Sequence, residues 1–201
     1  MSLKKAAEGI WTWKWLSPEK GYFFNGTLVS DGKNKVLIDP VILNDEGLSV
    51  LKSHGPFDAI YLTNKDHERM AYSLRKEWKI PISIHELDKP FLKENPDSIF
   101  KDGHELLCGL KVVHLREQKS PGECVFYLPG KKILIAGDAL IGHPAGSLNM
   151  LPEMKYADVQ KAQAGLRRLF SLHFEMLLVG DGESVMKDAY QKLEDFFGRL
   201  R

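Results

Sequence analysis

The stretch Ile133-Leu134-Ile135-Ala136-Gly137-Asp138 is an apolar run that ends in Gly-Asp. A short apolar run bounded by turn residues is typical of a buried strand, and glycine lets the backbone turn tightly beside the acid. The same pattern returns in Met176-Leu177-Leu178-Val179-Gly180-Asp181. Taken singly, each aspartate also fits an ordinary turn. Together they predict two carboxylates at strand ends, where loops on a rigid scaffold bring polar groups to one point.

Two more segments place polar side chains just past apolar strands. Thr63-Asn64-Lys65-Asp66-His67 follows the apolar run 58–63, and Lys119-Ser120-Pro121-Gly122 follows the apolar stretch 106–115. Asp66 alone is equally consistent with the cap of a helix. The four segments together predict a single polar site.

The rest of the chain alternates between strand and helix patterns. Hairpins are predicted at 22–38, around Asp31-Gly32-Lys33-Asn34, and at 124–136, around Pro129-Gly130. Two short strands broken at Gly109 are expected within 106–115. Asn44 as a cap and Gly55 as a stop predict a helix over residues 44–55, and helical spacing predicts helices over residues 70–78, 159–170 and 186–197. Strands followed by helices in each half predict one α/β domain over residues 1–201, with sheets packed face to face and helices outside.

Composition narrows the class of partner. The 201 residues carry a formal net charge of +1, so neither nucleic acid nor an acidic membrane surface is an expected partner. No apolar run is long enough to span a bilayer, and residues 1–8 do not form a signal peptide. The two cysteines, Cys108 and Cys124, are not a close pair, which favours a reduced, cytoplasmic setting.

From about Gly21 onward the chain resembles the metallo-β-lactamase superfamily. The hairpin ending in Leu37-Ile38-Asp39-Pro40 is similar to the family's opening hairpin, and Gly137-Asp138 matches the motif of its bridging aspartate. The resemblance implies a four-layer αβ/βα sandwich of two mixed sheets.

The metal-binding motifs of that family are altered here. The family's motif is Thr-His-x-His-x-Asp-His, and the corresponding segment of this chain, residues 63–67, is two residues shorter. Aligning Asp66-His67 with the Asp-His of the motif keeps the following helix and strand in register with the family. An ungapped alignment instead puts Glu68 and Arg69 at ligand positions. Lys119 replaces the histidine of His-Thr-Pro-Gly, and Asp181 replaces that of Gly-His-Gly.

In the family two metal ions flank a hydroxide that attacks an ester, thioester, amide or phosphoester. The resemblance implies that the first ion's site is lost. We expect the ammonium of Lys119 in its place, paired with Asp138 or Asp181. The second site keeps four ligands in kind, and they suit one Zn²⁺, Mn²⁺ or Fe²⁺ ion. These ligands are Asp66, His67, Asp138 and Asp181.

Three functions follow as expectations, each with a small molecule as the partner. The first is a hydrolase in which at most one metal ion activates water, with Asp138 and Lys119 catalytic and with Lys119 and His143 binding substrate. The alternative is a non-catalytic member that binds a small molecule or a protein, with a metal-free cluster of Lys119 and acids. An iron site for redox chemistry ranks third. The sequence leaves the oligomeric state open.

Overall fold

The computed structural model describes residues 3–200. Its larger sheet has seven strands in chain order, with antiparallel pairing up to β4 and parallel pairing from β4 to β7. The strands are β1 (Lys4–Ala7), β2 (Ile10–Leu16), β3 (Phe23–Ser30), β4 (Lys35–Ile38), β5 (Ala59–Leu62), β6 (Ile82–His85) and β7 (Ser98–Phe100). This sheet is therefore mixed.

The smaller sheet has the strand order β11-β10-β9-β8. It is also mixed, because β10 pairs with β11 in parallel while its other pairings are antiparallel. The strands are β8 (Lys111–His114), β9 (Cys124–Leu128), β10 (Ile133–Ile135) and β11 (Met176–Leu178).

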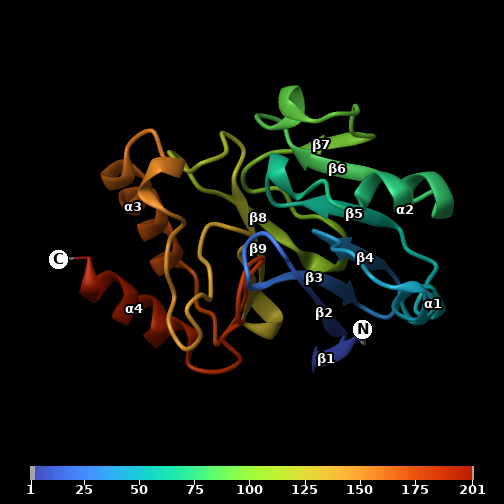
Figure 1. Cartoon of the computed structure of the whole chain (residues 1–201), viewed down its shortest axis with the longest axis horizontal. Coiled ribbons are helices and arrows are strands. Elements are labelled where there is room, and N and C mark those ends of the chain that lie inside the picture. The colour runs from blue at the N-terminus through green and yellow to red at the C-terminus, as the bar shows by residue number, and fades with distance from the viewer. Residues whose placement is uncertain (1–2, 201) are drawn as a thin grey trace.

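Four helices cover the outer faces of the two sheets, as Figure 1 shows. Helices α1 (Asp45–Ser53) and α2 (Ala71–Trp78) share an apolar cluster with the larger sheet. Helices α3 (Val159–Leu166) and α4 (Ala189–Arg199) pack in the same way on the smaller sheet. A third cluster fills the space between the sheets. This is the four-layer αβ/βα sandwich that the sequence predicted.

Local patterning explains most of these elements. Asn44 caps α1 by accepting a hydrogen bond from the backbone N–H of Gly47, and Asp158 caps α3 through Lys161 in the same way. In β2 the alternation of large and polar residues turns Trp13 fully into the core, where its indole N–H donates to the carbonyl of Val41.

Some sequence predictions were wrong in detail. The first of the two strands expected within 106–115 is instead a 3₁₀ turn (Leu107–Gly109), because Cys108 adopts φ 60°. Helix α3 passes into a 3₁₀ segment at Arg167, and the last helix begins at Ala189 rather than Met186. The sequence patterns also missed β1 and β7, the two edge strands of the larger sheet.

The topology brings the polar loops to one end of the sandwich. The parallel strands β4, β5 and β6 all finish at the same edge, as do β10 and β11 of the other sheet. Asn25 in β3 joins the two sheets there, since its side-chain amide donates to the carbonyls of Val179 and Gly182, both at 2.9 Å. Of the helices in residues 3–200, none is long and apolar enough to cross a membrane.

Candidate functional site

The loop after β5 carries two neighbouring side chains, Asp66 and His67, that differ in exposure. Asn64 caps a 3₁₀ turn (Lys65–His67) by accepting a hydrogen bond from the backbone N–H of Asp66. The turn leaves the carboxylate of Asp66 half exposed and buries the imidazole of His67. Behind it, Asp39 accepts hydrogen bonds from the backbone N–H and the hydroxyl of Thr63, at 2.9 and 2.6 Å.

His67 lies between two buried carboxylates. Its Nδ1 is 2.9 Å from Asp39 Oδ2, and its Nε2 is 2.9 Å from Asp138 Oδ1. Burial and the nearby Arg69 lower the pKa of His67, but the two aspartates raise it to about 9. The two carboxylates therefore favour the protonated form of the ring.

Asp138 is fixed by the turn that follows β10. Gly137 has φ 53°, and a Cβ on this residue would collide with the side chain of Thr63, so only glycine fits. Burial would raise the pKa of Asp138, but the cations of His67 and Lys119 hold it well below its ordinary value. Asp138 is therefore an ionised carboxylate between two cations.

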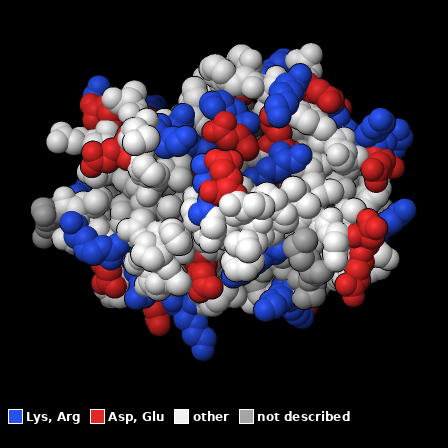
Figure 2. Space-filling model, in the orientation of Figure 1, with Lys and Arg blue, Asp and Glu red and all other residues white. Residues whose placement is uncertain are grey.

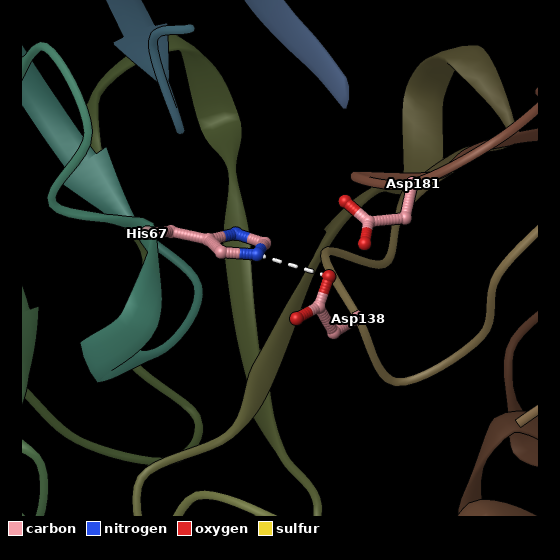
Figure 3. A group of neighbouring side chains, drawn as sticks. All are labelled: His67, Asp138 and Asp181. Carbon is pink, nitrogen blue, oxygen red and sulfur yellow. Dashed lines mark ion pairs between the residues drawn. The ribbon is translucent and has the colours of Figure 1, made fainter. Parts of the chain in front are cut away.

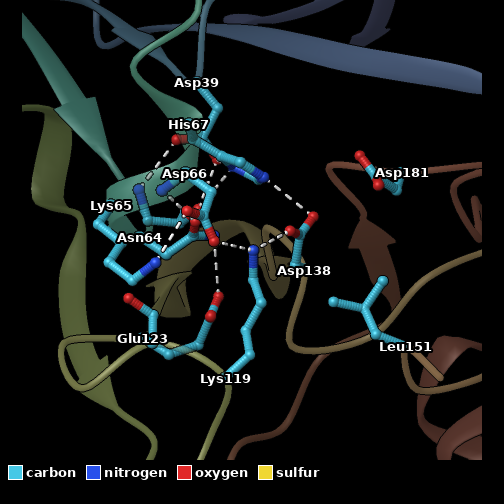
Figure 4. A network of polar contacts seen from close by, with 12 residues as sticks. Asp39, Asn64, Lys65, Asp66, His67, Lys119, Glu123, Asp138, Leu151 and Asp181 are labelled. Carbon is cyan, nitrogen blue, oxygen red and sulfur yellow. Dashed lines mark hydrogen bonds and ion pairs between the residues drawn. The ribbon is translucent and has the colours of Figure 1, made fainter. Parts of the chain in front are cut away.

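Lys119 was predicted to pair with Asp138 or Asp181, and it pairs with Asp138. Its Nζ is 2.6 Å from Asp138 Oδ2 and 2.8 Å from Asp66 Oδ2, so the ammonium bridges two loops (Figure 4). Burial opposes the charged form, but Asp138 raises the pKa of Lys119 well above its ordinary value. Glu123 is fully buried nearby and accepts a hydrogen bond from Asn64, and burial raises its pKa strongly.

Arg69 is a site residue that the gapped alignment overlooked. Its Nη2 is 3.1 Å from Asp181 Oδ1 and 3.0 Å from His67 Nε2, and its guanidinium lies 4.5 Å from the ring centroid of Phe24. Burial and the charge of Asp138 raise the pKa of Asp181 to about 6, while His67 and Arg69 oppose that rise. The sequence did contain a signal for Arg69 as a site residue, because the ungapped alignment places it at a ligand position.

Asp88, just beyond β6, holds together the loops that carry Asp66 and Lys119. This fully buried carboxylate accepts from the backbone N–H of Lys65 at 2.9 Å, the hydroxyl of Ser120 at 2.5 Å and the backbone N–H of Gly122 at 2.7 Å. Its position so far from both motifs in the chain explains why sequence patterns did not single it out.

Three of the four predicted metal ligands converge. Donor atoms of His67, Asp138 and Asp181 lie within 4.8 Å of one another (Figure 3), whereas Asp66 stands outside this group and pairs with Lys119 and Lys65. This donor set does not fit a metal ion as it stands. The guanidinium of Arg69 already contacts His67 Nε2 and Asp181 Oδ1, at 3.0 and 3.1 Å, where an ion would have to bind.

A cavity of about 550 Å³ opens beside these residues. Its basic lining residues are Lys20, Arg69, Lys119 and Lys155. Its apolar and aromatic lining residues are Tyr22, Phe24, Leu151 and Pro152. His143, predicted to bind substrate, does not line this cavity; it stacks on Tyr22 with ring centroids 4.7 Å apart. It thus backs one wall of the cavity.

Comparison with known proteins agrees with this fold. A family model described as "Metallo-beta-lactamase superfamily" matches residues 2–200. A metallo-β-lactamase from Pontibacter korlensis superposes with TM-score 0.75 at 18% identity, over 96% of this chain and 99% of that one. The metallo-β-lactamase FIM-1 from Pseudomonas aeruginosa, in its mono-zinc form, gives TM-score 0.72 at 15% identity, over 99% and 95%.

TTHA1623, solved in a di-iron-bound form, is more similar in sequence. It is 28% identical, with TM-score 0.68, over 84% of this chain and 91% of that one. No curated protein matches the sequence.

Proposed function

Because the chain belongs to the metallo-β-lactamase superfamily, we propose that it is a non-catalytic member that binds a small anionic molecule without a metal ion. The observation that carries this proposal is the position of Lys119, whose ammonium lies between Asp66 and Asp138. Both are residues of the motifs that hold metal ions in the family. Here the side-chain ammonium of Lys119 forms an ion pair with each of them.

The charge balance of the centre supports metal independence. Repulsion among clustered carboxylates would normally favour binding of a divalent cation, or protonation of one of them. Here Asp138 contacts both Lys119 and His67, and Asp181 contacts Arg69. The aspartates are therefore already paired with side-chain cations.

The lining of the cavity supports an anionic ligand. Lys20 pairs with Glu19, while Lys119 and Arg69 pair with the aspartates. Lys155 also lines the cavity and has no ion-pair partner within 4.0 Å among residues 3–200, although it interacts electrostatically with the exposed Glu19 at longer range. Its exposed ammonium is available to a carboxylate or phosphate group of a ligand in the cavity.

Other residues of the lining suit an apolar group on the same ligand. Tyr22 and Phe24 offer aromatic surface, and Leu151 and Pro152 offer aliphatic surface. Small-molecule sites typically combine such apolar walls with a few polar groups that fix orientation. We therefore expect a compact anion that carries an apolar or aromatic part.

Calorimetric titration of EDTA-treated protein tests this proposal. Benzoate and phenyl phosphate are the probes, with benzamide as a neutral analogue and inorganic phosphate as an anion without a ring. We expect at least one aromatic anion to bind about tenfold more tightly than either control probe. Lys155→Met should weaken that binding, whereas Lys161→Met, which removes an exposed lysine of α3, should not. Equal binding of benzamide, or an unchanged Lys155→Met, would refute an anion site.

The second candidate is the metal-dependent hydrolase predicted from the sequence. Two observations favour it: the convergence of His67, Asp138 and Asp181, and the similarity to a protein solved with two iron ions. It requires Arg69 to leave its present position, 3.0 Å from His67 Nε2 and 3.1 Å from Asp181 Oδ1. Turnover of thioesters, lactones, phosphodiesters or β-lactams by purified protein, lost in Asp138→Ala, would establish this candidate in place of the first.

A further inference from the structure

We infer that the guanidinium of Arg69 blocks a latent divalent-cation site formed by His67, Asp138 and Asp181, and that removing it opens the site. The inference rests on the proposed metal-independent function, because it explains why the group of His67, Asp138 and Asp181 needs no metal ion. Lys119 accounts only for the half around Asp66 and Asp138.

The distances carry this inference. Nη2 of Arg69 is 3.0 Å from His67 Nε2 and 3.1 Å from Asp181 Oδ1, so one nitrogen contacts two of the three converging donors. A zinc ion needs both donors at about 2.0–2.2 Å. An ion and the guanidinium nitrogen therefore cannot occupy this space together.

Packing holds Arg69 in this position. Its guanidinium lies against the ring of Phe24 at 4.5 Å from the centroid, a cation–π arrangement. Its side chain is 13% exposed, and Nη1 is buried without a hydrogen-bond acceptor among the described residues. A donor left unsatisfied is unfavourable, so this position of the arginine is maintained by its ion pair and by the aromatic ring.

Replacing Arg69 changes both the space and the charge. Without the guanidinium, Asp181 has lost its ion-pair partner and remains buried beside the ionised Asp138. Two neighbouring carboxylates that lack a counterion favour a divalent cation, with the imidazole of His67 as a third donor. The expected ligand of the altered site is a single Zn²⁺ or Mn²⁺ ion.

The test compares Arg69→Ala and Arg69→Gln with wild type and with Arg168→Ala, which removes an arginine paired with the exposed Asp102. Each protein is titrated with Zn²⁺ and with Mn²⁺ by calorimetry, and its unfolding temperature is measured with and without the ion. Circular dichroism establishes that each variant is folded. Glutamine keeps part of the side-chain volume, in case alanine destabilises the loop.

We expect the Arg69 variants to bind one ion per chain and to gain thermal stability from it, while wild type and Arg168→Ala do neither. Adding Asp181→Asn to a binding variant should weaken the affinity about tenfold or more. If folded Arg69 variants bind no ion, the inference is wrong but the proposed function stands. If wild type binds an ion as tightly as the variants, both fail.

Discussion

Lys119 and Arg69 are the residues that set this centre apart, because each places a cation against acids that would otherwise repel one another. A buried ion pair is not in itself a strong source of stability. Removing one partner is strongly destabilising, however, because it leaves an uncompensated buried charge. The substitutions below measure how far the aspartates depend on these cations.

Lys119→Met should lower the free energy of unfolding by about 3–5 kcal/mol, because ionised Asp138 then loses its contact at 2.6 Å. Urea denaturation measures the change. Lys132→Met is the matched control, since its pair with Glu175 is largely exposed and should contribute little to stability. Adding Asp138→Asn to Lys119→Met should restore part of the loss. An effect of Lys119→Met no larger than the control would show that the pair is not needed.

His67 gives the protein a specific pH dependence. Its folded-state pKa of about 9 exceeds the ordinary 6.5. Its contribution to stability is therefore complete below pH 6.5 and is lost as the pH rises through about 9. Relative to His67→Gln, wild type should lose stability across that range, as measured by urea denaturation at several pH values. His104→Gln, an exposed control, should follow wild type; a parallel course for His67→Gln would contradict an imidazolium at this position.

At the scale of elements, the centre depends on loops that buried polar side chains hold together through hydrogen bonds. Asp88 after β6 binds Lys65 in one loop and both Ser120 and Gly122 in another, so Asp66 and Lys119 are positioned by a residue that contacts neither. Asn25 has the corresponding role between β3 and the loop after β11. The parallel strands bring the loops to one edge, and these buried polar residues fix them there.

Asp88→Ala should lower the free energy of unfolding by about 3 kcal/mol, because three donors lose a charged acceptor in a buried setting. Chemical denaturation gives the value. Asp158→Ala, which removes only the cap of α3, should change it by about 1 kcal/mol. Equal effects would mean that Asp88 does no more than an ordinary cap.

The sequence predicted elements well where local pattern decides them. The cap at Asn44 and the turns at residues 31–34 and 129–130 are local signals, and α1 and both hairpins follow them. The short edge strands β1 and β7 were missed, because they follow from pairing with a neighbouring strand more than from their own pattern. The turn at Cys108 was missed for a related reason, since its positive φ is unusual for a residue other than glycine.

At the scale of the whole molecule, the fold was predictable and the pairing of charges only in part. Ordered motifs fixed the sandwich, and Lys119 was expected to pair with Asp138 or Asp181. In the structure Lys119 pairs with Asp138, and Asp181 pairs with Arg69 instead. That choice depends on how loops from two sheets meet, which no spacing along the chain reveals. On the face in Figure 2, basic and acidic side chains of the described residues are interspersed.

The metal content of the wild-type protein tests the central claim most directly. Protein produced with added Zn²⁺, Mn²⁺ and Fe²⁺, dialysed and then subjected to elemental analysis, should contain far less than one ion per chain. Its unfolding temperature should be the same with these ions and with EDTA. One tightly held ion per chain that raises the unfolding temperature would contradict the claim that Lys119 and Arg69 take the place of metal ions.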